Sequence, residues 1–214
     1  AYSLLCPSNK GILINVGTGI ICFAKENDKN YKIAGNGFDK GDLGSGYWLG
    51  KELLSKLILN ESVILFDKDL KSIFQKIKEV FERDNMNDIY KIIEQNDNVF
   101  SKLSLLGKEA VNLAEFGNDI ALSVVQEGTR YVSDYIEELC ELVNYNNTSL
   151  ILAANGSVIK NDFYRKLVND SLSFQFESIK WIISDLSPAY GAGIMAASYN
   201  DIKIDMSKIV LNIN

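Results

Sequence analysis

The chain has 214 residues, of which 47% are hydrophobic and 23% charged, so fibrous and disordered classes are excluded. Lysine and arginine number 22 against 28 aspartates and glutamates, and the net charge of −6 offers no general attraction to nucleic acids or anionic membranes. No histidine occurs, which excludes histidine-based triads and histidine metal sites. We therefore expect no nucleic-acid partner and assign no metal ligands.

Residues 11–16 (GILINV) and 20–25 (IICFAK) are short apolar runs rich in β-branched side chains. They are joined by Gly17-Thr18-Gly19, which predicts a buried β-hairpin. The tip of such a hairpin exposes backbone N–H groups and a hydroxyl, and these groups together can hold phosphate oxygens.

Six of the fifteen glycines gather between residues 35 and 50, around Asp42 and Ser45. Glycines at this density let a ligand approach the backbone closely. The Asp42 carboxylate could then bind polyol hydroxyls or cap the following helix, whereas Ser45 is the expected cap. Tyr47 and Trp48 could stack on a sugar, but we favour packing of both rings in the core.

Helical periodicity fills the middle of the chain, and plain core packing explains its apolar stripes. Asn118 or Asp119 is suited to cap the longest of these helices. The expected helices cover residues 45–59, 68–83, 87–95, 99–106 and 119–145.

Strands return in the last third of the chain. Expected strands at 149–153 and 176–184 each lead into a helix, at about 158–171 and at 188–199, and residues 201–214 form a terminal strand or short helix. The whole pattern predicts an α/β fold. Gly156-Ser157 is expected at a helix N-terminus, where N–H groups attract an anion or the backbone approaches a flat ligand, and Gly191-Ala192-Gly193 resembles it.

The three cysteines, Cys6, Cys22 and Cys140, are far apart and form no C-x-x-C pair. An odd count without clustering favours a reducing compartment, so we expect a cytoplasmic protein. No apolar run approaches the roughly 18–20 residues that a membrane span needs. We therefore expect no membrane partner.

Five motifs, in order along the chain, resemble those of the BadF/BadG/BcrA/BcrD-type ATPases and N-acetylglucosamine kinases of the actin/hexokinase/Hsp70 ATPase superfamily. The hairpin tip resembles the second phosphate motif, and residues 35–52 resemble the family's glycine-rich G-x-G…G-D-E-G-S-x-Y-W-I-G block. Residues 152–167 resemble the adenosine motif. The remaining two matches are the helix start at 117–121 and the closing segment at 187–193.

The resemblance implies that residues 1–214 form the C-terminal lobe of an actin-like ATPase, ribonuclease H-like in fold, with a helical insert at about 60–146. It implies ATP-dependent phosphorylation of a small sugar, of the N-acetylglucosamine kinase type, with ATP and Mg²⁺ as cofactors. The implied ATP-binding residues are Gly17, Thr18, Gly19, Gly156, Ser157, Lys160 and Gly191. The implied sugar-binding residues are Gly35, Asn36, Gly37 and Asp42.

The sequence also departs from this family pattern. Leu43 stands where the family block has glutamate, and no Asp-Gly pair occurs for a first phosphate hairpin of the D-G-G-G-T type. By resemblance the catalytic aspartate should fall immediately before Ala1, so no catalytic residue is assigned in the chain. We therefore expect it to be inactive alone and to need a missing N-terminal lobe or a partner chain; a homodimer is a further expectation.

Two alternatives remain open at this point. In the first, the chain is a noncatalytic lobe that binds nucleotide or sugar, or dimerises, with residues 68–145 as its interaction surface. In the second, it is an activator-type ATPase of a dehydratase system, whose iron–sulfur cluster needs cysteines at a dimer interface. The positions of Cys22 and Cys140 in apolar stripes predict core residues instead.

Overall fold

The computed structural model describes residues 2, 6, 11–27, 29–37, 41–95, 99–183, 188–205 and 212–213. The chain divides into two compact units. The first unit consists of Ala1–Val16, Ile21–Gly35 and Ser133–Asn214, and the second of Gly17–Ile20 and Asn36–Val132. The sheet belongs to the first unit, and helices make up most of the second.

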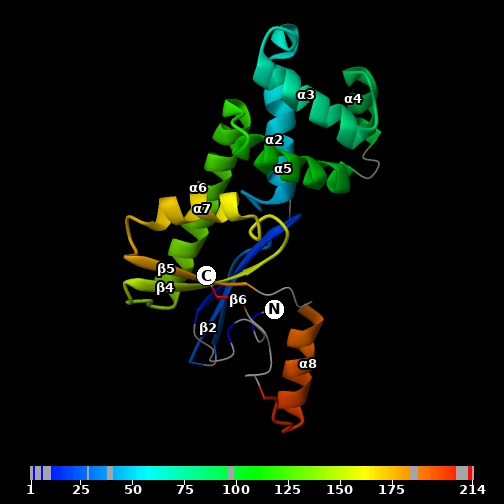
Figure 1. Cartoon of the computed structure of the whole chain (residues 1–214). Coiled ribbons are helices and arrows are strands. Elements are labelled where there is room, and N and C mark those ends of the chain that lie inside the picture. The colour runs from blue at the N-terminus through cyan, green and yellow to red at the C-terminus, as the bar shows by residue number, and fades with distance from the viewer. Residues whose placement is uncertain are drawn as a thin grey trace. The chain divides into compact units, whose positions relative to one another are not determined.

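The six-stranded sheet of the first unit has the order β3-β2-β1-β4-β5-β6 (Figure 1). β4 pairs in parallel with both β1 and β5, while β3 and β6 pair antiparallel with their neighbours β2 and β5. The expected hairpin and the two later strands are confirmed. The strands are β1 (Ile12–Val16), β2 (Ile20–Glu26), β3 (Lys29–Ala34), β4 (Ser149–Asn155), β5 (Ser178–Ile183) and β6 (Asn212–Ile213).

Strand β3 was not predicted from the sequence. Glu26 of β2 pairs with Lys29 of β3, and Asn27 between them has a φ of +48°, which a tight turn requires. The strand is polar and largely exposed because it forms an edge of the sheet, where charged residues are common. Its sequence therefore lacks the apolar alternation by which strands are found.

Both faces of the sheet are covered. On one face, Leu13 and Ala153 pack with Cys6, and Ile194 of α8 (Pro188–Tyr199) lies against this cluster. The other face packs against α7 (Asp162–Leu172), where the Trp181 indole N–H of β5 donates to Asn169 Oδ1 at 2.8 Å. The bounds of α8 confirm the predicted helix at 188–199.

The second unit contains four complete α-helices and one short 3-10 helix in its described part, and a further α-helix, α6, begins there and continues into the first unit. α2 and α5 pack backbone to backbone: a Cβ at Gly50 would overlap the Leu103 carbonyl oxygen, and one at Gly107 would overlap that of Gly46. The elements are α2 (Gly46–Leu59), the short 3-10 helix η1 (Glu61–Val63), α3 (Lys68–Phe81), α4 (Met86–Gln95), α5 (Val99–Glu115) and α6 (Asp119–Leu142).

The expectation of a short helix at 99–106 was wrong, since α5 continues to Glu115. Gly107 interrupts the apolar pattern in the sequence, but in the structure it is the contact point with α2. The buried stripe continues beyond it through Ala110, Val111 and Ala114. A close backbone contact therefore looked like a helix end.

Asn118 caps α6, as predicted, by accepting from Ala121 N at 2.8 Å. Its amide nitrogen also donates to the Asp69 carbonyl oxygen at 3.1 Å and to Ser72 Oγ at 2.7 Å. These bonds tie the start of α6 to the first turns of α3. None of the described helices is long and apolar enough to cross a membrane.

Candidate functional site

The hairpin tip, residues 17–19, is fastened to the start of α2 within the second unit. Gly17 N donates to Gly19 O at 2.9 Å, and the carbonyl oxygens of Gly17 and Thr18 accept from Gly46 N at 2.7 Å and Tyr47 N at 3.1 Å. Ser45, the confirmed cap, accepts from Trp48 N at 3.2 Å. The N–H groups at the start of α2 are therefore already used and leave no anion site at that helix end.

The N–H groups of the tip itself are different. Thr18 is exposed, and its N–H and hydroxyl, like the N–H of Gly19, have no hydrogen-bond partner among the described residues. Consecutive backbone N–H groups in a tight turn form a small concavity that attracts anions. The tip can therefore donate to the oxygens of a phosphate group.

The structure brings Asp42 to this tip. The Asp42 side chain is only 6% exposed, and its Oδ2 lies 3.4 Å from Ile20 N. A Cβ at Gly19 would lie 2.7 Å from the same oxygen, so an alanine there would displace the carboxylate. The predicted phosphate hairpin and the predicted sugar segment thus meet at one carboxylate.

The other residues of the glycine-rich segment are placed as follows. Asn36, which is exposed, and Gly37, with a φ of +100°, belong to the second unit, as Asp42 does. Gly35 belongs to the first unit, where its carbonyl oxygen accepts from Lys32 Nζ at 3.2 Å. The Trp48 ring packs edge-on against Tyr131 at 5.5 Å between centroids, as expected for core packing rather than sugar stacking.

In the first unit, the turn after β4 packs directly on the end of β1. Gly156 has a φ of +93°, and a Cβ there would overlap the Val16 carbonyl oxygen and lie 2.6 Å from its carbonyl carbon. That oxygen accepts from Val158 N at 2.9 Å and Ile159 N at 3.2 Å. We call residues 156–161 the Gly156 turn; its glycine makes room for the end of β1, where the Asn15 side-chain oxygen would also lie 2.9 Å from a Cβ.

The sequence predicted a helix N-terminus at Gly156-Ser157, and this prediction was wrong. Residues 157–160 form turns, and α7 begins only at Asp162, where Asn161 caps it by accepting from Tyr164 N at 2.9 Å. The reason is the pair of bonds from Val158 and Ile159 to β1, which hold the chain out of helical geometry. The expected dipole-driven anion site is therefore not located at Gly156-Ser157.

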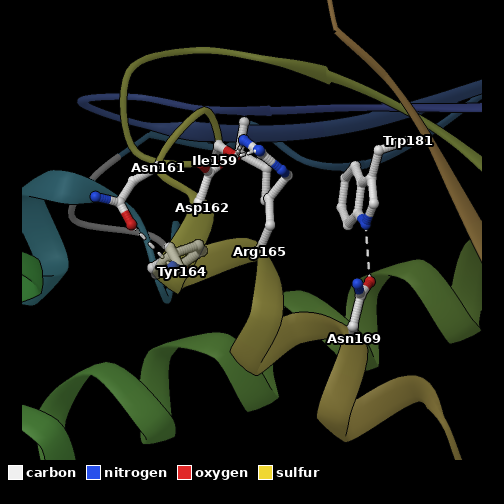
Figure 2. A network of polar contacts seen from close by, with 7 residues as sticks. All are labelled: Ile159, Asn161, Asp162, Tyr164, Arg165, Asn169 and Trp181. Atoms are coloured by element: carbon white, nitrogen blue, oxygen red, sulfur yellow. Dashed lines mark hydrogen bonds and ion pairs between the residues drawn. The ribbon is translucent and has the colours of Figure 1, made fainter. Parts of the chain in front are cut away.

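Arg165 of α7 stabilises the Gly156 turn by a hydrogen bond to its backbone, and the sequence did not predict this role (Figure 2). Its side chain is buried, Nη1 donates to the Ile159 carbonyl oxygen at 3.0 Å, and Nη2 pairs with Asp162. Ser157 on the turn is exposed and Lys160 is half-buried. The turn is thus a fixed backbone platform with two polar side chains at its surface.

Gly191 lies in the first turn of α8 and is buried, whereas Gly193 faces open space in the same helix. The closing motif thus forms part of a helix, and its first residue, Ser187, lies outside the described residues. Gly191 can permit close packing at the start of α8 but provides no polar side chain.

The three cysteines are free and buried, which confirms the prediction that Cys22 and Cys140 are core residues and shows that Cys6 is buried as well. Burial raises the pKa of the Cys6 thiol to about 12 and, with smaller contributions from Glu137 and Glu141, that of Cys140 to about 12 as well. Such thiols resist the ionisation that metal binding needs. In the described part of the chain, no three Cys, Asp or Glu residues cluster closely enough to hold a metal ion.

Neither a protein-family model nor a curated protein matches the sequence, but solved structures do match the fold. A protein of Chromobacterium violaceum assigned as an N-acetylglucosamine kinase superposes with a TM-score of 0.65 at 16% identity, over 90% of this chain. A second, from Porphyromonas gingivalis, gives 0.62 at 19% identity over 94%. The chain shares the fold of the matching part of these two proteins. A ROK family glucokinase of Streptomyces griseus, solved with glucose and AMPPNP, gives 0.53 at 13% identity over 89%.

The sugar-kinase fold extends beyond this chain in all three structures. The chain covers 61%, 65% and 60% of their lengths, which is less than two thirds in each case. These likenesses bear on the fold of the chain and on its α/β class. The narrower resemblance to BadF/BadG-type ATPases stays a prediction.

Proposed function

We propose that the chain is the second lobe of an ATP-dependent sugar kinase of the N-acetylglucosamine kinase type. The observation that carries the proposal is the Gly156 turn, a fixed glycine backbone at the carboxyl end of β4, beside the parallel strand β1. In parallel sheets ligands bind at the carboxyl ends of the strands. The strand order supports a ribonuclease H-like lobe, and the helices of the second unit support a helical insert at about 60–146.

ATP is assigned to each unit separately. In the first unit, Gly156, Ser157, Lys160 and Gly191 are proposed for the nucleoside part, because their segments resemble the family's adenosine motif and closing segment and the Gly156 turn follows the carboxyl end of β4. In the second unit, the Thr18 and Gly19 N–H groups are proposed for phosphate oxygens, with Gly17 shaping the tip. Mg²⁺ would neutralise phosphate charge, but the described residues hold no carboxylate cluster for it and we derive no step through it.

The sugar is assigned to Gly35, Asn36, Gly37 and Asp42 by the resemblance of their segment to the family block. Hydrogen bonds from amide and carboxylate groups are the usual way in which proteins orient a polyol. No carboxylate in the described part of the chain is assigned as the base that activates the sugar hydroxyl. The chain alone is therefore proposed to be inactive.

A missing lobe or partner chain is supported by the surface of α8. This helix (PAYGAGIMAASY) has no charged residue, and Tyr190, Met195 and Tyr199 are 59%, 46% and 84% exposed. A helix that is apolar all round is normally buried. A hollow of about 610 Å³ beside it is lined by Ala189, Tyr190, Gly193, Ile194 and Ile204, which fits a covering protein surface.

The noncatalytic alternative also has an observation in its favour. Leu59, Leu65 and Phe66, around η1, are 79%, 76% and 88% exposed and form an apolar surface on the second unit. Such surfaces mark interaction sites, including homodimer interfaces. Burial of all three thiols supports a cytoplasmic location and gives no support to the iron–sulfur activator alternative.

ATP-dependent phosphorylation of N-acetylglucosamine tests the proposal. The chain is assayed alone and then together with a candidate first lobe that carries a D-G-G-G-T hairpin and an aspartate. We expect turnover only in the mixture, and a Thr18→Ala variant that turns over almost normally, because the backbone N–H groups remain. Turnover by the chain alone would refute the missing base, and no turnover by any mixture would favour the noncatalytic alternative.

A further inference from the structure

Three separate bonds join the hairpin tip to the segment 42–47 inside the second unit. Asp42 Oδ2 accepts from Ile20 N at 3.4 Å, Gly17 O accepts from Gly46 N at 2.7 Å, and Thr18 O accepts from Tyr47 N at 3.1 Å. Two of these bonds use backbone groups only. The Asp42 bond is made by a side chain, so it depends on the identity of that residue.

The environment of Asp42 suits a structural anchor for the tip. The residue is 6% exposed, its carbonyl oxygen accepts from Ser45 N at 3.2 Å, and its Oδ2 would lie 2.7 Å from a Cβ at residue 19. A buried carboxylate that accepts from backbone N–H groups is held firmly, because leaving it unsatisfied away from water is costly. Its position in turn fixes the peptide between Gly19 and Ile20.

We propose that Asp42 is a positioning residue that holds the phosphate-binding hairpin and thereby couples sugar binding to ATP binding. The inference rests on the proposed function of the hairpin and of the glycine-rich segment. A sugar that binds Asn36, Gly37 and Asp42 restrains the Asp42 backbone and carboxylate. The same restraint orders Ile20 and the neighbouring N–H groups of Thr18 and Gly19. These N–H groups are then already in position when a phosphate group binds.

Coupling of this kind is reciprocal. If N-acetylglucosamine tightens ATP binding by some factor, ATP must tighten N-acetylglucosamine binding by the same factor, typically about 5–150-fold between coupled sites. If the Asp42 side chain only bound the sugar, the result would be different. Its removal would then lower the affinity for the sugar without changing the hairpin. The motion of the hairpin therefore separates a positioning role from a binding role.

The positioning role is tested by hydrogen exchange of the Ile20 amide, which donates to Asp42 Oδ2, in the 214-residue chain without ligands. We expect exchange at least about 10-fold faster in Asp42→Asn, since the amide replaces the charged acceptor. Ser45→Ala is the matched control: it removes the side-chain cap of α2 from the same segment but no bond to the tip. Gly19→Ala should also speed exchange, because its Cβ displaces the carboxylate while Asp42 remains.

The coupling is tested by isothermal titration of Mg-ATP with and without N-acetylglucosamine. We expect the sugar to tighten ATP binding at least 5-fold in the wild-type chain and in Ser45→Ala, and not in Asp42→Asn. Unchanged hairpin exchange in both Asp42→Asn and Gly19→Ala, or undiminished coupling in Asp42→Asn, would overturn the proposal. If the wild-type chain binds neither ligand, the proposed function and the coupling fail, while the exchange rates still decide whether Asp42 positions the hairpin.

Discussion

Replacing Gly156 by alanine tests the close backbone contact between the Gly156 turn and β1. The new Cβ would overlap the Val16 carbonyl oxygen and lie 2.6 Å from the carbonyl carbon, so the Gly156 turn has to move away from β1. The residue would also have to keep a φ of +93°, a region that L-residues with a Cβ avoid. Two separate penalties therefore act on the folded state.

The left-handed backbone costs roughly 1–2 kcal/mol. Moving the turn weakens the two bonds from Val158 N and Ile159 N to Val16 O, each contributing about 0.5–1.5 kcal/mol. Together these effects predict that Gly156→Ala lowers the free energy of unfolding of the first unit by about 2–5 kcal/mol. Gly117→Ala is the matched control, because Gly117 has a φ of +86° but no atom within 4 Å of a new Cβ, so only the backbone penalty of about 1–2 kcal/mol applies.

The two tryptophans allow each unit to be followed by itself. Trp181 lies in β5 of the first unit and Trp48 in α2 of the second. Urea unfolding followed by fluorescence is therefore measured for Gly156→Ala in a Trp48→Phe background and for Gly117→Ala in a Trp181→Phe background. Equal losses of stability in the two variants would refute the argument, since the contact with Val16 would then add nothing.

Three further outcomes are expected. Asn118→Ala should destabilise the second unit by about 2–4 kcal/mol in urea unfolding followed through Trp48, because it removes the α6 cap and two bonds to α3; a loss below 0.5 kcal/mol would contradict this. Burial, with smaller contributions from Glu137 and Glu141, raises the pKa of Cys140 from 9.0 to about 12. The contribution of the neutral thiol to the free energy of unfolding is therefore complete below pH 9. It falls as the pH rises toward about 12, by up to about 1.4 kcal/mol per pH unit. Cys140→Ala should reduce that alkaline slope, and an identical slope would contradict the assignment. Tyr199→Ser should leave the stability of the chain within about 0.5 kcal/mol, since the ring is 84% exposed, yet weaken binding of a covering lobe at least 10-fold by isothermal titration; unchanged binding would exclude this part of α8 from the interface.

Local signals predicted the parts of the fold that depend on neighbouring residues. The caps Ser45 and Asn118 were predictable because a side-chain oxygen one turn before an apolar stripe satisfies the first N–H groups of a helix. The strands β1 and β4 were predictable because both are continuous apolar runs in the interior of the sheet.

Contacts between distant segments decided the parts that the sequence did not predict. Gly107 marks a helix contact rather than a helix end, since its partner Gly46 lies 61 positions earlier in the numbered chain. The delayed start of α7 results from the bonds that Val158 N and Ile159 N donate to Val16 O, at the end of β1, the first described strand. The bond from Ile20 N to Asp42 spans 22 residues, so the hairpin and the glycine-rich segment could be found separately but not as neighbours.

The most direct test of the account is the response of the backbone amides to AMPPNP with Mg²⁺, followed by NMR in the 214-residue chain. The proposed ATP site predicts saturable shifts at Thr18 and Gly19 in the second unit and at Gly156 and Ser157 in the first. Gly117, which has a similar positive φ but no proposed role, should not shift. Absence of shifts at both glycine turns at millimolar nucleotide, or saturable shifts confined to residues outside them, would contradict the claim that this lobe binds ATP.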